Sequence, residues 1–288
     1  MSYMMRWETD LGRFRNTAQP FLCQKEAANN LILGLLGNSR ADDPPEVMAL
    51  VENSQGPLLV GLKTDPARAL ILSFAAELGA SNFLAQSLYQ SRLQIPGVIG
   101  PRPLAAAFSE TWARETGTSP ALLMHERIYE ATQVILPVPA TPGHPRWATS
   151  HDLEAIVPWF EAFAQEALPA EAPNQTKELV QRRLEAGFPS GGVLLWEVDD
   201  KIVSLAGYGS PTGSGVRVGP VYTPPYLRGH GYASHVVASL TEALLTSTYR
   251  QVFLFTDLAN PTSNDIYQRI GYRPVIDIDH YQFKDNAS

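Results

Sequence analysis

The sequence contains a single cysteine, Cys23, and has fewer basic than acidic side chains. One cysteine excludes an intrachain disulfide and a cysteine-based zinc site, so no metal is expected. Asp and Glu number 29 against 22 Lys and Arg, which gives a formal net charge of −7. A chain this acidic lacks the broad basic face that general nucleic-acid binding requires, so no nucleic-acid partner is expected.

Long hydrophobic runs are also absent. The longest apolar stretches fall far short of the roughly 18 residues that a membrane helix needs, so no membrane partner is expected. Residues 1–15 are polar and lack the apolar core of a secretory signal. With 44% hydrophobic and 18% charged residues, the composition is that of an ordinary globular protein, and we expect a cytoplasmic location.

The length of 288 residues favours two domains, because one hydrophobic core rarely serves so long a chain. The best boundary is residues 137–145, which read PVPATPGHP. Four prolines and a glycine in this stretch exclude a helix or a central strand. We therefore predict an N-terminal domain over residues 1–140 and a C-terminal domain over residues 146–288.

The N-terminal half is predicted to be the smaller domain, of the α/β class. Apolar spacing and turn residues predict helices over residues 24–36, 82–93 and 103–114, and strands over residues 57–63, 69–74 and 128–136. The turn signal Thr64-Asp65-Pro66 between the first two strands indicates a hairpin.

The C-terminal half has the stronger pattern. Helices are predicted over residues 153–168, 176–186, 229–247 and 262–270. Strands are predicted over residues 146–149, 193–198, 202–209, 216–223 and 251–256, and from residue 272 onward. This order of elements indicates an α+β fold built around one mixed sheet.

A glycine-containing turn stands before the longest predicted helix. It comprises Arg228, Gly229, His230, Gly231, Tyr232 and Ala233. A helix N-terminus offers unpaired N–H groups and a partial positive charge, and glycines let the backbone approach a bulky anion such as a pyrophosphate. The turn therefore predicts a phosphate-binding site, although the same glycines would also suit a strand-to-helix turn without a ligand.

At this turn the sequence resembles the GNAT acyltransferases, whose signature is Arg/Gln-x-x-Gly-x-Gly/Ala. A second block, residues 255–272 (FTDLANPTSNDIYQRIGY), is similar to the asparagine-to-tyrosine segment of the same family. The two motifs occur in the family's order, and the resemblance covers residues 146–284. It implies a GNAT-like mixed sheet with splayed central strands, flanked by helices.

The resemblance also implies a co-substrate, acetyl-CoA, lying between the strands at residues 216–223 and 251–256. Main-chain groups of Val221 and Thr223 would contact the pantetheine arm, and the N–H groups of residues 228–233 would hold the pyrophosphate. Asn260 and Asn264 would fix the pantetheine and the entrance of the following helix, with Asn260 also suited to be its N-cap.

Two residues carry the chemistry that the resemblance implies. The N–H of Val221 would stabilise the oxyanion, and Tyr267 would protonate the departing thiolate, since a phenol with a pKa of about 10 keeps its proton at neutral pH. Tyr267 could instead be a core aromatic of an amphipathic helix. No general base is assigned; Glu197 and Asp257 are the nearest acids.

The function expected is therefore direct acetyl transfer from acetyl-CoA to a primary amine of a small molecule or peptide. The lone cysteine lies outside the motif region, which disfavours an acyl-enzyme. One alternative is a non-catalytic module that binds acetyl-CoA or CoA and regulates a partner. Transfer to a hydroxyl is a third reading.

The first half carries a faint echo of the second. A hairpin over residues 58–74 followed by Val98-Ile99-Gly100-Pro101 and a helix resembles the hairpin over residues 193–209 followed by Val218-Gly219-Pro220 and a helix. We therefore expect a degenerate GNAT-like domain in which residues 102–105 replace the glycine turn. It would wall the acceptor side of the cleft, stabilise the protein, or pair two subunits as a homodimer.

Overall fold

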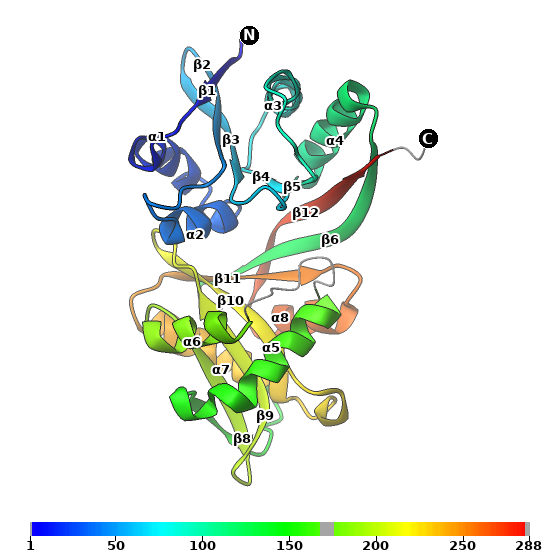
Figure 1. Ribbon diagram of the computed structural model, residues 1–288. Coiled ribbons are helices and arrows are strands. Elements are labelled where there is room, and N and C mark those ends of the chain that lie inside the picture. Colours follow the sequence, from blue (N-terminus) through cyan, green and yellow to red (C-terminus); the bar gives the residue numbers. More distant parts are fainter. Residues whose placement is uncertain (1, 168–175, 286–288) are drawn as a thin grey trace. The chain divides into compact units, whose positions relative to one another are not determined.

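The computed structural model describes residues 2–167 and 176–285 (Figure 1). The chain forms two compact units. The first contains the residues up to Ile128 together with those from Val275 onward, and the second contains Tyr129–Pro274.

This division differs from the expected one at both ends of the second domain. The proline-rich segment lies inside the second unit, and the last strand of the chain, β12 (Arg273–Lys284), lies mainly in the first. There β12 pairs antiparallel with β5 (Gly97–Pro101), from Ile278 opposite Pro101 to Gln282 opposite Gly97. A pairing between residues so far apart in the chain leaves no local signal, so composition alone could not place the boundary.

The first unit has helices on both faces of its sheet. Its elements are β1 (Met4–Trp7), α1 (Leu11–Cys23), α2 (Asn30–Asn38), β2 (Val47–Asn53), β3 (Gly56–Lys63), β4 (Leu70–Leu72), α3 (Leu78–Gln90), β5, α4 (Arg102–Thr116) and β6 (Ser119–Ala131). The strand order is β1-β2-β3-β4-β5-β12-β6. The expected hairpin is the antiparallel pair of β3 and β4.

The two faces of this sheet bury separate hydrophobic clusters. Met48 and Leu50 of β2 pack with α1 and α2, whereas Val47, Ala49 and Val51 pack with α3 and α4. This alternation follows from the two-residue period of a strand. The helix expected over residues 24–36 begins only at Asn30, and α1 has no counterpart among the expected elements.

The second unit contains the sequence motifs. Its elements are β7 (His144–Trp147), α5 (Leu153–Ala167), α6 (Thr176–Ala186), β8 (Gly192–Val198), β9 (Lys201–Gly209), β10 (Gly215–Tyr222), α7 (Tyr232–Thr246), β11 (Gln251–Asp257) and α8 (Pro261–Arg269). The strand order is β6-β11-β10-β9-β8-β7. The predicted α+β fold with a mixed sheet flanked by helices is confirmed; residue 168, the expected end of α5, lies outside the described residues.

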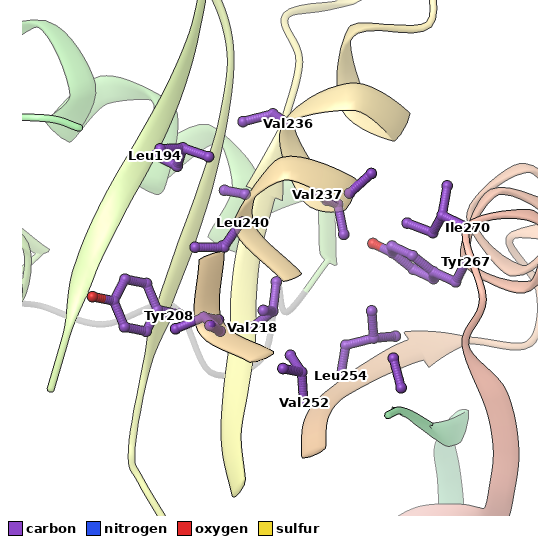
Figure 2. Packing of buried hydrophobic residues seen from close by; sticks show 14 of the residues in the cluster. Leu194, Tyr208, Val218, Val236, Val237, Leu240, Val252, Leu254, Tyr267 and Ile270 are labelled. Atoms are coloured by element: carbon purple, nitrogen blue, oxygen red, sulfur yellow. The ribbon is translucent and has the colours of Figure 1, made fainter. Parts of the chain in front are cut away.

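Helix α7 covers one face of the second sheet and α5 and α6 cover the other. Val236, Val237 and Leu240 of α7 pack with Leu194 and Val218 of the sheet (Figure 2). Ile156, Phe160 and Val180 pack on the opposite face with Val193, Leu195 and Leu205. Consecutive residues of β8 therefore belong to different clusters, as expected for a strand buried on both faces.

Both halves of the chain follow the same order: strand, two helices, three strands, helix, strand, helix, strand. In each half the fourth strand is parallel to the fifth, β4 to β5 and β10 to β11. The last strands are exchanged, however, because β12 lies beside β5 and β6 lies beside β11. The expected duplication of a GNAT-like domain stays a prediction.

The same order corrects the expected alignment of the halves. By position, β4 corresponds to β10, and β5 corresponds to β11, not to β10 as the sequence echo indicated. The counterpart of the glycine turn is therefore the connection between β4 and α3, residues 73–77 (SFAAE), not residues 102–105. Since residues 73–77 contain no glycine, the first unit still lacks the turn.

Across residues 2–167 and 176–285, no helix combines the length and the hydropathy that a membrane span requires.

Candidate functional site

The two central strands of the second unit separate along their length. Strands β10 and β11 pair in parallel only through Gly215–Arg217 opposite Gln251–Phe253. Farther on, β10 remains paired with β9, with Val221 opposite Ala206, and no pairing with β11 is recorded for the described residues. The expected splay is therefore present. It leaves main-chain groups that an amide-rich ligand arm can use as an added strand would.

An irregularity in β10 lies at the edge of this opening. The register with β9 shifts between Val218 and Val221. The guanidinium of Arg183, on α6, donates to the carbonyl of Gly219 within the shifted stretch. Burial, together with the neighbouring charge of Arg217, lowers the pKa of Arg183 to about 10. No local pattern in the sequence connects α6 with β10, so this contact could not be predicted.

The glycine turn is exposed, and most of its main-chain amides have no recorded partner within the described residues. Gly229 and Gly231 have φ angles of 84° and 81°, in the left-handed region that glycine adopts without strain. Residues 228–231 are exposed, and Gly231 caps α7 without a side-chain hydrogen bond. Within the described ranges, no hydrogen bond is recorded from the N–H groups of residues 229–233. These donors lie at the positive end of a helix dipole and are not used by the fold.

Arg228 differs from the rest of the turn. Its N–H donates to the carbonyl of Pro225 at 3.3 Å, so the available donors begin at Gly229 and not at Arg228 as expected. Its side chain pairs with Glu166 at 2.7 Å and donates to the carbonyl of Thr223 at 2.9 Å. Arg228 therefore connects the end of α5 to the end of β10, and its charge is already paired.

Tyr267 lies in the hydrophobic core between α8 and α7. Its ring packs edge-on against Tyr272, with centroids 6.0 Å apart, and its hydroxyl points toward Val237 (Figure 2). Burial raises the pKa of Tyr267 to about 12. No hydrogen bond from its hydroxyl is recorded in the described structure. The raised pKa keeps the phenol protonated at neutral pH but makes it a weaker acid, so the role of Tyr267 as proton donor stays a prediction.

The two predicted asparagines are engaged by the fold. Asn260 caps α8, its side chain accepting from the N–H of Ser263 at 3.1 Å. Asn264 donates to the carbonyls of Asp257 and Asn260 at 2.9 and 2.7 Å. Its Oδ1 accepts from the hydroxyl of Tyr129 at 3.0 Å. The Asn264 amide therefore fixes the entrance of α8, and its expected contact with the pantetheine stays a prediction.

Tyr129 is a core residue that also neighbours the site, a position that no sequence motif indicates. It lies fully buried at the end of β6 and contacts α8, the helix that carries Tyr267. Gln268 also donates to its hydroxyl, at 3.3 Å. The exchange of last strands brings this residue of the first half of the chain beside α8.

The two strand residues predicted to contact the co-substrate differ in availability. Thr223 uses its hydroxyl with Ser204 at 2.8 Å, and its carbonyl accepts from Arg228. Val221 packs its side chain against the α7 cluster, on the part of β10 that β11 does not cover. Its assignment as the oxyanion donor remains a prediction.

The candidate acids are all engaged. Glu197 pairs with Arg146 at 2.7 Å, and this contact lowers the pKa of Glu197. Asp257 accepts from the N–H of Ala259 at 2.8 Å, within its own loop. Neither contact points to a role as general base, and none is assigned. Over the described ranges, no cluster of His, Cys, Asp and Glu could hold a metal ion.

Comparisons with known proteins agree with this geometry. Residues 211–281, which include the glycine turn and Tyr267, match the FR47-like protein family. A GNAT-family acetyltransferase from Colwellia psychrerythraea has a TM-score of 0.61 at 13% identity, covering 98% of this chain and 100% of its own. A GCN5-related N-acetyltransferase from Sphaerobacter thermophilus has a TM-score of 0.62 at 15% identity, covering 98% and 95%. No curated protein has significant sequence similarity to the chain.

The chain therefore has the fold of these GNAT-family acetyltransferases. At these identities the solved structures establish the fold, and both align with this chain over nearly its whole length.

Proposed function

We propose that this protein is an acyl-CoA-dependent N-acyltransferase that moves an acetyl group from acetyl-CoA directly to a primary amine. One observation carries the proposal: the N–H groups of residues 229–233, which make no recorded hydrogen bond within the described residues, lie at the start of α7, which follows the splayed strand β10. The turn fits a diphosphate, and the splay fits an amide-containing arm.

The residues of the site have separate roles in this reaction. The N–H of Val221 stabilises the oxyanion that forms when the neutral amine attacks the thioester carbonyl. The carbon–sulfur bond then breaks, and Tyr267 gives its proton to the thiolate and regains one from solvent. The proton of the attacking amine leaves to water, because Glu197 and Asp257 are engaged elsewhere.

The acceptor is a primary amine on a small molecule or a peptide. A net charge of −7 attracts cationic molecules over long distances, which favours amines at the encounter stage. Attack requires the neutral form, since an ammonium has no lone pair.

Thiol release tests the proposal. Wild-type protein is incubated with acetyl-CoA and a panel of small amines and lysine-containing peptides, and free CoA is measured with a thiol reagent. We expect amine-dependent release, and we expect Tyr267→Phe to reduce it about a hundredfold while acetyl-CoA still raises the melting temperature. Stabilisation by acetyl-CoA without release for any amine would favour the non-catalytic module, and no stabilisation would contradict both.

A further inference from the structure

The proline-rich segment before β7 lies against the glycine turn. The hydroxyl of Thr141 donates to the carbonyl of His230 at 2.7 Å, and its N–H donates to Nε2 of His235 at 3.3 Å. His235, in the first turn of α7, contacts the carbonyl of Gly231 through Nδ1 at 3.0 Å. From its composition alone, this segment is predicted only to join two domains.

These contacts define the tautomer of His235. A main-chain carbonyl can only accept a hydrogen bond and a main-chain N–H can only donate one. The contact with Gly231 therefore requires a proton on Nδ1, and the contact with Thr141 requires a bare Nε2. The imidazole thus connects the segment to the turn through both ring nitrogens.

The segment itself is held on β8. The buried Trp196 donates from its indole to the carbonyl of Pro142 at 2.9 Å, and its ring lies 5.4 Å from that of His235. Gly143 has a φ of 108°, and a Cβ there would lie 2.2 Å from the carbonyl oxygen of Glu197. Thr141 is therefore one residue away from a well-anchored point of the backbone.

We propose that Thr141 and His235 are positioning residues that aim the amides of the diphosphate-binding turn; this inference rests on the proposed function. The C=O and N–H of a trans peptide point in opposite directions. Thr141 holds the carbonyl of His230, and so the N–H of Gly231, in the same peptide, faces away from the segment. The carbonyl of Gly231 accepts from the main-chain N–H of His235 at 3.2 Å, and the His235 imidazole adds a second contact to it at 3.0 Å, which turns the N–H of Tyr232 in the same way.

A pair of donors tests this role. Acetyl-CoA carries the diphosphate, whereas acetyl-pantetheine carries the same thioester arm without it. We expect Thr141→Val to lower kcat/KM for acetyl-CoA about two- to tenfold, the range of one lost hydrogen bond, and to leave kcat/KM for acetyl-pantetheine unchanged. His235→Phe, which keeps a ring beside Trp196, should show the same selective loss.

The controls separate positioning from folding. Thr141→Ser keeps the hydroxyl and should restore wild-type values. Thr246→Val removes a similar hydroxyl-to-carbonyl bond at the other end of α7. It should leave kcat/KM unchanged for both acetyl-CoA and acetyl-pantetheine. Equal loss with both donors, or no loss with acetyl-CoA, would overturn the positioning role. Wild-type protein that binds no acetyl-CoA would instead overturn the proposed function, and this inference with it.

Discussion

Arg228 and Glu166 form an ion pair, with 2.7 Å between Nη2 of the first and Oε2 of the second. Both side chains are about half exposed, at 48% and 47%. The pair fixes the arginine of the glycine turn to the end of α5, so this arginine does not add a free charge to the turn. The donors left for an anion are main-chain amides.

The side chain of Arg228 should contribute little to stability or to acetyl-CoA binding. Arg228→Gln should lower the free energy of unfolding by less than about 1 kcal/mol, because exposed ion pairs contribute little. It should weaken acetyl-CoA binding only slightly. Calorimetric titration and urea unfolding measure the two effects, and Glu166→Gln serves as the matched control. A loss of affinity of a hundredfold in Arg228→Gln alone would show that the guanidinium contacts the ligand.

Acetyl-CoA binding should be far more sensitive to substitution of the turn glycine Gly231. Gly231 has a φ of 81°, where a side chain costs about 1–2 kcal/mol and β-branching costs more. Gly231→Val should therefore weaken acetyl-CoA binding at least about tenfold while far-ultraviolet circular dichroism stays unchanged. Gly209→Val is the control, since a Cβ at Gly209 meets nothing within 4 Å and its φ is not left-handed. Equal affinities for the two variants would show that the turn does not bind the ligand.

Asn264 and Tyr129 should prove energetically coupled. Asn264→Ala leaves the buried Tyr129 hydroxyl without its acceptor at 3.0 Å, and we expect a loss of about 1–3 kcal/mol in the free energy of unfolding. The free energy of unfolding lost in the double variant Asn264→Ala/Tyr129→Phe should be smaller than the sum of the losses in the two single variants, by at least about 0.5 kcal/mol.

Tyr249→Phe supplies the control for this cycle. The Tyr249 hydroxyl donates to the carbonyl of Pro189 at 2.9 Å and shares no partner with Asn264. The losses from Asn264→Ala and Tyr249→Phe should therefore add. Strict additivity in the Tyr129 cycle as well would mean that the Tyr129 contact does not stabilise α8.

Alkaline pH should reveal the buried state of Tyr267. Its folded pKa of about 12 lies above the unfolded value of about 10, so the neutral phenol is the form that the fold favours. The corresponding stability is fully present below about pH 10 and is lost as pH rises toward 12. Tyr267→Phe should lose less stability than wild type over this window in urea unfolding. Identical pH profiles would contradict the raised pKa.

Local signals predicted much of the second unit. The bounds of α6 coincide with the expected 176–186, and the spacing of its apolar residues explains why. Just before α5, Thr149 and Asp152 form a capping box, with the N–H of Thr149 donating to the Asp152 carboxylate at 2.7 Å. This local pairing explains why the start of α5 at Leu153 coincides with the predicted start.

The features that sequence analysis missed depend on contacts between distant residues. Helix α1 shows buried Leu11, Phe14, Ala18 and Leu22 at helical spacing, yet Pro20 argues against a helix there. The pairing of β12 with β5, the contact of Arg183 with Gly219 and the bonds of Thr141 join residues that no motif relates. The glycine turn could be found because its chemistry lies within one short segment.

The amide protons of Gly229 and Gly231 test the central claim most directly. In protein labelled with ¹⁵N-glycine, titration with CoA should move both resonances downfield in a saturable way, because each N–H gains a charged acceptor. The amide resonance of Gly209 should not shift during the titration. Saturable CoA binding that leaves the Gly229 and Gly231 resonances unmoved would contradict the account.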